Sequence, residues 1–224
     1  MKVAMIGAGG WGTAMMISLA ARHDDLFMYC RNPKTAQEMQ KSRENTNYLP
    51  GCRIPLHVKI TSSLETAVKG AGCVILCTPS HAVEAWAESL VPWLEKDTVV
   101  VCASKGLADH AGHRLSEVIT DKVKGITKKI VVLSGPNHAE EVGRGLPCAT
   151  VAASEVPEAV QVVQDLFMSP VFRVYRSDDI KGVEYGGALK NIMALACGVL
   201  DGIGLGDNSR AALMTRGLVE MTRF

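Results

Sequence analysis

The sequence predicts an α/β fold, in which a doubly wound, mostly parallel sheet is followed by the start of an all-helical domain. About eight short apolar segments alternate with helical segments over residues 1–176, which is typical of a sheet covered by helices. Residues 73–77 are apolar without a break, as expected for a strand buried on both faces. After residue 177 the strands stop and helical patterns follow. We therefore expect one domain over residues 1–177 and the first part of a helical domain over residues 178–224, whose chain stops inside that domain.

Turn residues and periodicity delimit the individual elements. The first helix follows Gly12, Pro33 begins a helix that reaches residue 44, and the polar residues 62–65 begin one that reaches residue 68. Turn residues make 45–51 a loop. Further helices are expected over 82–94, 113–122, 157–167, 182–200 and from 210 onward, and a polar helix start is expected within residues 134–141. The expected strands are 3–6, 26–30, 58–61, 73–77, 98–103, 129–133, 149–153 and 172–175.

Composition excludes several classes of partner. The 224 residues are 47% hydrophobic and 21% charged, with a formal net charge of +1. A chain so close to neutral has no field that would favour nucleic acid or a membrane surface. The sequence has no apolar run near the ~18 residues that a membrane span requires, and its start lacks the pattern of a signal peptide. We expect neither nucleic-acid binding nor membrane insertion.

The cysteines indicate a reducing compartment. There are seven, an odd number, and none forms a C-x-x-C pair. Several fall in predicted buried strands, where a free thiol behaves as a small apolar side chain. No histidine, cysteine or acidic residues have the spacing of metal ligands, so no metal site is predicted. A cytoplasmic protein is expected.

Three glycines at the amino terminus predict the function. Gly7, Gly9 and Gly12 form a G-x-G-x-x-G pattern between the first strand and the first helix, and a second strand begins near residue 26. In this setting Gly7 allows the turn, Gly9 lets the backbone approach a pyrophosphate, and Gly12 lets helix and strand pack closely. The alternative, a purely structural glycine turn, does not explain the whole layout. We expect a Rossmann-type dinucleotide-binding domain.

The residue at the end of the second strand indicates which dinucleotide the site prefers. NAD-specific sites commonly place an acidic residue there to bind the ribose 2′-hydroxyl, whereas an arginine accommodates a 2′-phosphate. Arg31 occupies this position. A solvated strand-end arginine is the plainer interpretation. The sequence favours NADP, and NAD is not excluded.

Two lysines are candidates for ligand binding and acid/base catalysis. Lys105 follows the strand 98–103 and should lie at the carboxyl edge of the sheet, where ligands bind in such folds. Lys190 and Asn191 are the strongly polar residues of a helix that is otherwise apolar nearly all round, so we expect that helix to be buried. Burial would lower the pKa of Lys190 and make it the best acid/base in the chain. The alternative is a lysine whose stem is buried and whose ammonium reaches water.

Five segments together closely resemble bacterial NAD(P)-dependent glycerol-3-phosphate dehydrogenases. They are residues 7–14, 104–106, 134–140, 189–191 and 208–218. The resemblance implies a Rossmann-type domain, an all-helical domain and a cytoplasmic enzyme. Its reaction would be the reduction of dihydroxyacetone phosphate to sn-glycerol 3-phosphate by NADPH or NADH, for phospholipid synthesis. A homodimer is compatible with it.

The resemblance also implies roles for individual residues. Lys190 would be the catalytic acid/base. Cofactor contacts would come from Gly7, Gly9, Gly10, Trp11, Gly12, Arg31, Asn32, Lys105 and Ala139. Substrate contacts would come from Lys105, Gly135, Asn137, Lys190 and Asn191.

The sequence departs from the family at several points. Gly10 stands where the family often has serine, and Asn137-His138 where it often has serine or threonine followed by phenylalanine. The family's later segment, with a substrate-binding aspartate and a Ser-Arg-Asn run, does not occur within the 224 residues. Two alternatives therefore stay open: a related dehydrogenase of 3-hydroxyacids or ketopantoate, and a dinucleotide-binding fragment without turnover.

Overall fold

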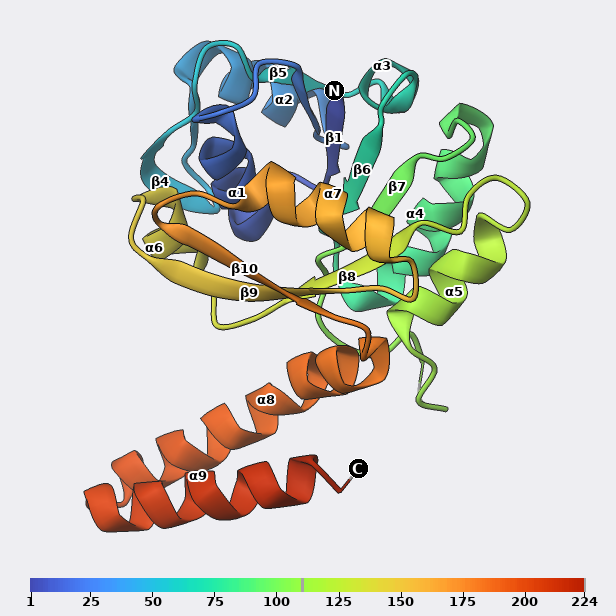
Figure 1. Cartoon of the computed structure of the whole chain (residues 1–224). Helices are drawn as coiled ribbons and strands as arrows, with labels where there is room; N and C mark the ends of the chain where they lie inside the picture. The colour runs from blue at the N-terminus through green and yellow to red at the C-terminus, as the bar shows by residue number, and fades with distance from the viewer. Residues whose placement is uncertain (110, 224) are drawn as a thin grey trace.

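The computed structural model describes residues 1–109 and 111–223. Its main feature within that part is an eight-stranded sheet in the order β10-β9-β8-β7-β6-β1-β2-β5 (Figure 1). Neighbouring strands are parallel except β8 and β9. The strands are β1 (Val3–Ile6), β2 (Leu26–Tyr29), β5 (Lys59–Thr61), β6 (Cys73–Leu76), β7 (Val99–Cys102), β8 (Ile130–Ser134), β9 (Cys148–Ala153) and β10 (Phe172–Ser177). The predicted fold class is confirmed, and the predicted strand segments correspond to these strands.

The helices agree with the predictions except at some ends. The stretch expected as one helix over 82–94 is α4 between two short 3₁₀ segments, the second of which contains Pro92, a residue that cannot donate a backbone hydrogen bond. The last helix starts at Asp207 rather than residue 210. The helices are α1 (Gly10–Ala20), α2 (Pro33–Ser42), α3 (Leu64–Val68), α4 (Val83–Leu90), α5 (Leu115–Lys122), α6 (Ala139–Gly143), α7 (Pro157–Phe167), α8 (Ile180–Gly202) and α9 (Asp207–Met221).

Helices cover both faces of the sheet. Alternate residues of a strand point to opposite faces, so Val3 and Met5 pack in one core with α1 and α7, while Ala4 and Ile6 pack in the other with α4 and α5. Figure 1 shows α7 on one side of the strands and α4 and α5 on the other. Two cores on one sheet explain why the central strands are apolar without alternation.

The order of the strands creates a switch point between β1 and β6. The chain moves from β1 outward to β2 and β5, and then returns to place β6 on the other side of β1. The loops after β1 and β6 therefore diverge and leave a crevice at their carboxyl ends, where open α/β sheets bind ligands.

A small hairpin lies where the sequence predicted only a loop over residues 45–51. Strands β3 (Glu44–Asn45) and β4 (Leu49–Arg53) pair antiparallel. The buried Asn45 side chain donates hydrogen bonds to the Ala8 carbonyl oxygen (2.9 Å) and to Thr13 Oγ1 (2.8 Å). Turn-forming residues dominate this segment, and its order comes from these long-range contacts, so local sequence patterns missed it.

Replacing Asn45 by aspartate should lower the free energy of unfolding by about 1–3 kcal/mol, because a carboxylate cannot donate to the Ala8 carbonyl. Denaturant unfolding measures the change. The control is Asn47→Asp, two residues on and exposed, which should stay within about 0.5 kcal/mol of the unchanged chain. Equal effects at both positions would show that Asn45 does not hold the hairpin in place.

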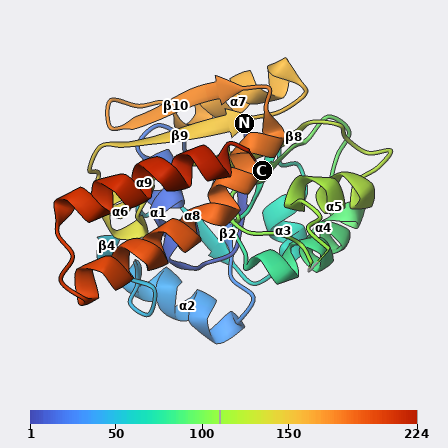
Figure 2. The ribbon, with the colours of Figure 1, turned by 90° about the horizontal axis from the view of Figure 1, so that it is seen from below.

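The predicted burial of α8 is wrong. Of its residues, all of which are described, only Glu184 and Gly187 are buried. Leu195 is 72% exposed, and several other apolar side chains of α8 and α9 are also exposed. Figures 1 and 2 show why: α8 touches the α/β part with its first turns and then runs past it, with α9 alongside. An apolar composition favours burial, but within the described chain α9 covers only part of the far end of α8, so Leu195 and other apolar side chains stay exposed.

The boundary predicted at residue 177 falls between β10 and α8, and the division into two domains stays a prediction. Residue 224, the end of the predicted helical domain, lies outside the described residues. In the part of the chain that the structure describes, no helix combines the length and apolar character that crossing a membrane requires.

Candidate functional site

A cleft of about 330 Å³ lies at the switch point. It joins the glycine turn after β1 to the loops after β6, β7 and β8, as expected from the topology. Its lining residues are Gly9, Gly10, Trp11, Gly12, Cys77, Thr78, Ala103, Ser104, Lys105 and Asn137. A larger cavity of about 680 Å³ lies along α5, but none of the predicted site residues lines it. The smaller cleft is therefore the candidate site.

The three glycines of the turn lie in different surroundings. A Cβ on Gly12 would lie 2.2 Å from the Gly7 carbonyl oxygen, and one on Gly7 would lie 2.2 Å from the Cys77 carbonyl oxygen. Gly7 also has a φ of +119°, which side chains disfavour. A Cβ on Gly9 would meet no described atom within 4 Å. Gly7 and Gly12 thus allow close packing, whereas Gly9 faces open space in the cleft.

Backbone amides of α1 point toward that space. The helix begins after Gly9, and no side chain caps its first amides. It also has no acidic residue in its first turn. Free amides together with the helix dipole favour an anion at this end.

The structure shows why position 10 suits glycine. A Cβ at this position would lie 2.7 Å from the carbonyl oxygen of Tyr48, in the β3–β4 hairpin. It would also lie 3.6 Å from Cβ of Ala139, at the start of α6. Glycine therefore lets the hairpin approach the turn closely.

Lys105 is the lysine that the fold partly buries at this cleft. Its Nζ donates to the Gly135 carbonyl oxygen (3.0 Å) and to Asn137 Oδ1 (3.4 Å). Asn137 Nδ2 donates in turn to the Ala149 carbonyl oxygen at 3.0 Å, which orients its own oxygen toward the lysine. The ammonium also lies 5.9 Å from the centre of the Trp11 ring. Residues from three separate segments thus converge on one ammonium group.

Thr78 and Ser104, which follow β6 and β7, support the loop that carries Lys105. Ser104 Oγ donates to the Thr78 carbonyl oxygen (2.6 Å) and accepts from the Thr78 backbone amide (3.1 Å). These two bonds join the loops after β6 and β7. The positions of both residues after strands placed them at the carboxyl edge of the sheet, but no pattern in the sequence indicated that they bond to each other.

Buried polar side chains without a hydrogen-bond partner also line the cleft. Two buried side-chain polar atoms in the described residues lack a hydrogen-bond partner, Trp11 Nε1 and Thr78 Oγ1, and both residues line the cleft. Such groups are rare and call for an explanation. Burial raises the pKa of the neighbouring Cys77 to about 12, so Cys77 stays a neutral thiol near pH 7. The donors and the free amides suit an oxygen-rich ligand such as a pyrophosphate.

Lys190 is exposed, contrary to the expectation that its helix is buried. Its Nζ donates to Asn191 Oδ1 at 2.7 Å. Desolvation lowers the pKa of Lys105, and the positive charge of Lys190 lowers it further. The desolvated lysine is therefore Lys105, and Lys190 acts on it only through its charge, since Lys190 does not line the described cleft.

Several predicted residues do not line the cleft. Arg31 is exposed just beyond β2. Asn32 accepts hydrogen bonds from the amides of Lys34 and Thr35 and thereby caps α2. Ala139 packs near Gly10 at the start of α6. Two groups of predicted residues are thus not among the lining residues of the described cleft: the cofactor candidates Gly7, Arg31, Asn32 and Ala139, and the substrate candidates Gly135, Lys190 and Asn191.

The pKa of Lys105 gives a direct check of this geometry. Replacing Lys190 by methionine should raise the pKa of Lys105, because a repelling positive charge is lost. Nuclear magnetic resonance of the labelled lysine side chain follows the titration. Since the folded chain lowers this pKa, Lys105 should lose its charge, and with it any bound anion, at a lower pH than an ordinary lysine. A Lys105 pKa that does not respond to Lys190→Met would place the two lysines apart.

Comparison with known proteins identifies relatives over the whole chain. Residues 2–160 match the family described as NAD-dependent glycerol-3-phosphate dehydrogenase N-terminus, and residues 179–224 match the corresponding C-terminus. The glycerol-3-phosphate dehydrogenase [NAD(P)+] of Moorella thermoacetica is 51% identical over 100% of this chain and 66% of its own length. That of Pelotomaculum thermopropionicum is 45% identical over 100% of this chain and 64% of its own. The chain thus spans about two thirds of the length of these curated relatives.

The chain is also similar to a solved structure of a glycerol-3-phosphate dehydrogenase. The crystal structure of glycerol-3-phosphate dehydrogenase from Coxiella burnetii superposes with a TM-score of 0.91 at 35% identity, over 99% of this chain and 67% of that one. A ketopantoate reductase from Ralstonia eutropha superposes with a TM-score of 0.61 at 18% identity, over 88% of this chain and 61% of that one. The similarity to the ketopantoate reductase shows a shared fold and does not extend to function.

Proposed function

Because the chain belongs to the NAD-dependent glycerol-3-phosphate dehydrogenase family, we propose that its cleft binds NADP or NAD and serves the interconversion of dihydroxyacetone phosphate and sn-glycerol 3-phosphate. The bound nicotinamide supplies or accepts the hydride. In the direction of reduction the product enters glycerophospholipid synthesis. The family relationship favours this substrate over ketopantoate or a 3-hydroxyacid, for which the likeness is limited to the fold.

The proposed cofactor contacts follow from the cleft. The amides at the start of α1 would bind the pyrophosphate, with Gly9 leaving room for it and Gly7 and Gly12 shaping the turn. Trp11, Lys105 and Ala139 would contact the same ligand, since Lys105 lies near the Trp11 ring and Ala139 near Gly10. Arg31 and Asn32, exposed after β2, would lie beside the adenosine ribose, and the positive charge of Arg31 favours NADPH.

The proposed chemistry needs positive charge and a proton. Hydride transfer to a ketone carbon leaves negative charge on its oxygen, which must be stabilised and then protonated. Lys190 would donate the proton, while Asn191, which accepts a hydrogen bond from Lys190, would orient it. Lys105, held by Gly135 and Asn137, would attract the substrate phosphate or the developing charge. In the direction of oxidation Lys190 would take the proton back.

One observation carries this proposal: the cleft brings the partly buried ammonium of Lys105, held by Gly135 and Asn137, together with the positive end of the α1 dipole, and no carboxylate is among its described lining residues. Bringing like charges together is unfavourable unless an anion compensates them. The arrangement therefore suits a phosphorylated, negatively charged substrate.

Oxidation of NADPH, followed by absorbance in the presence of dihydroxyacetone phosphate, tests the proposal. Ketopantoate and a 3-oxoacid are the parallel substrates, and NADH is compared with NADPH. We expect turnover with dihydroxyacetone phosphate alone. Preferential turnover of either acid would overturn the assignment of substrate.

A second candidate function is dinucleotide binding without turnover by these 224 residues. The exposure of Lys190 and of the apolar side chains of α8 and α9 favours it, because a proton donor in open water has lost the environment that tunes it. Tight cofactor binding with no oxidation of NADPH would support this candidate.

A cytoplasmic location and a homodimer complete the proposal. All seven cysteines lie in the described part of the chain and are free thiols, which suits a reducing compartment. The exposed apolar side chains Ile192, Leu195 and Val199 on α8 favour burial against other protein. Light scattering at several concentrations tests the assembly, and a monomer throughout would exclude the homodimer.

A further inference from the structure

Helix α8 is held against the sheet by a short segment at its start. Ile180 and Val183 pack against the core on the side of α4 and α5. Glu184 and Gly187 are the two residues of this fully described helix that are buried. The rest of α8 runs along α9 (Figure 2). The direction of the helix, and so the place of Lys190, depends on these few contacts.

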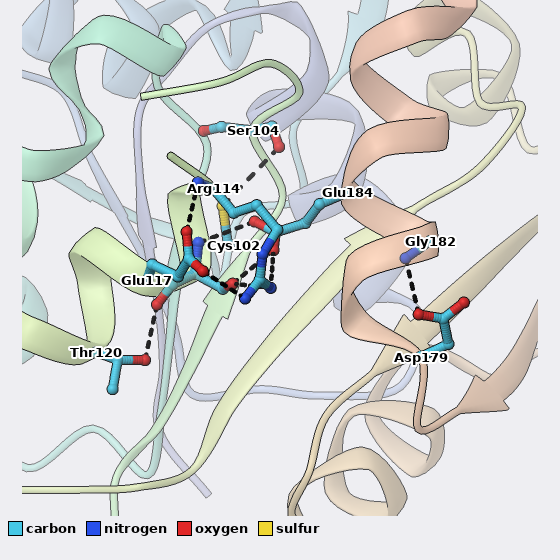
Figure 3. A network of polar contacts seen from close by, with 9 residues as sticks. Cys102, Ser104, Arg114, Glu117, Thr120, Asp179, Gly182 and Glu184 are labelled. Carbon is cyan, nitrogen blue, oxygen red and sulfur yellow. Dashed lines mark hydrogen bonds and ion pairs between the residues drawn. The ribbon is translucent and has the colours of Figure 1, made fainter. Parts of the chain in front are cut away.

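The Glu184 carboxylate lies in a buried polar cluster. Its side chain is 4% exposed, and its Oε1 accepts from the backbone amide of Ser116 at 2.8 Å. Its Oε2 accepts from Ser116 Oγ at 2.5 Å and from Arg114 Nη1 at 3.0 Å. Arg114 Nη2 also donates to Glu117 Oε1 at 2.7 Å, so the guanidinium joins carboxylates from α5 and α8 (Figure 3).

Gly187 is the point of closest approach. A Cβ built on it would lie 2.7 Å from Ser134 Oγ at the end of β8, and 3.9 Å from Cγ of Lys105. Lys190 follows three residues later, which is close to one helical turn. The contact at Gly187 therefore sets how far the ammonium of Lys190 lies from that of Lys105.

This arrangement favours a role beyond stability. A buried ion pair adds little stability over apolar side chains of the same volume, and its best-attested use is to fix the register of packed elements. Here the pair fixes a helix against the end of the sheet, and the glycine contact lies one turn along from it.

We propose that Glu184 and Gly187 are positioning residues that fix α8 against the sheet and thereby place Lys190 opposite Lys105 at the cleft. This inference rests on the proposed function, in which Lys190 transfers the proton. Neither residue touches the cofactor or the substrate in this proposal. Both act through the position of Lys190.

The first test compares two neighbouring glycines. Gly187→Val must push Ser134 or move the helix, whereas at Gly186 a Cβ meets no described atom within 4 Å, so Gly186→Val is the matched control. In each background the rise in Lys105 pKa caused by Lys190→Met is measured by nuclear magnetic resonance. The rise should shrink with Gly187→Val and persist with Gly186→Val. Equal rises in both backgrounds would overturn the proposal.

A graded variant separates displacement from misfolding. In Gly187→Ala the new methyl group meets Ser134 Oγ at 2.7 Å, whereas in the double variant with Ser134→Ala its nearest contact there is Cβ at 3.7 Å, an ordinary van der Waals distance. We call the rise in Lys105 pKa caused by Lys190→Met the coupling between the two lysines. This coupling should shrink in Gly187→Ala and return in the double variant. Failure of Ser134→Ala to restore it, in a folded chain, would also count against the proposal.

The carboxylate is tested with Glu184→Ala and the conservative Glu184→Gln, which keeps the shape and one acceptor for Ser116. The coupling between Lys105 and Lys190 should fall more in Glu184→Ala than in Glu184→Gln. Amide hydrogen exchange in α8 should also be faster in Glu184→Ala. Where turnover is measurable, Gly187→Val and Glu184→Ala should lower kcat by about 10- to 100-fold, as expected when a reacting group is displaced. NADPH affinity should change less than about twofold, because the glycine turn is untouched.

Turnover tests the proposed function, and the coupling between Lys105 and Lys190 tests the positioning role of Glu184 and Gly187. If no substrate is turned over, the proposed function fails, while the lysine coupling still decides whether Glu184 and Gly187 position α8. If turnover is found and the coupling is insensitive to both residues, the positioning role fails alone.

Discussion

Replacing Gly9 by alanine is expected to weaken NADPH binding by about tenfold or more while leaving the melting temperature unchanged. Gly9 has φ −79° and ψ −179°, an extended conformation that alanine adopts without strain. The added methyl group meets no described protein atom within 4 Å. The space that it fills is therefore the space proposed for the pyrophosphate. Fluorescence titration with NADPH and thermal unfolding measure the two quantities.

Gly12→Ala is the informative contrast to Gly9→Ala. Its methyl group would lie 2.2 Å from the Gly7 carbonyl oxygen, a backbone atom that cannot move without opening the turn. Stability should fall by about 1–3 kcal/mol, as for overpacking elsewhere, and cofactor affinity should fall with it. Unchanged NADPH affinity in Gly9→Ala would show that the dinucleotide does not approach this turn.

Replacing Lys190 by alanine is expected to lower kcat by about 10²- to 10⁴-fold, the contribution of one well-placed proton transfer. Lys190 is exposed, so the free energy of unfolding should change by less than about 0.5 kcal/mol. NADPH affinity should stay nearly constant, because Lys190 does not line the described cleft. Steady-state kinetics with dihydroxyacetone phosphate, alongside cofactor titration, measure these effects.

Two control variants define the role of Lys190. Lys181→Ala removes another exposed lysine of α8, near the start of the helix, and should leave kcat unchanged. Lys190→Arg keeps the positive charge but cannot release a proton near neutral pH. Activity as low as that of the alanine variant would assign proton transfer to Lys190. Full activity in Lys190→Arg would instead reduce its role to charge.

The sheet and the glycine turn were predictable because their signals are local. Strands such as 73–77 are apolar throughout, as burial on both faces requires, and the pattern of Gly7, Gly9 and Gly12 reflects the steric needs of one short turn. The constraint on Gly7 comes in part from the distant Cys77, but each signal is written within a short stretch of residues, so a single sequence contains it.

The features that the sequence did not predict depend on contacts between residues far apart in the chain. Asn45 orders its hairpin through contacts more than thirty residues away in sequence, on Ala8 and Thr13. The apolar pattern of α8 predicted burial, but a pattern does not say whether a covering element is present. For the same reason the sequence assigned the desolvated ammonium to Lys190, whereas the loops around Gly135 bury Lys105 instead.

A crystal structure of the chain with NADPH bound tests the central claim most directly. We expect the pyrophosphate to lie on the amides at the start of α1 beside Gly9, and the nicotinamide to lie at the end of the cleft formed by Lys105 and Asn137. Density for the dinucleotide in the larger cavity along α5, with the glycine turn empty, would contradict it.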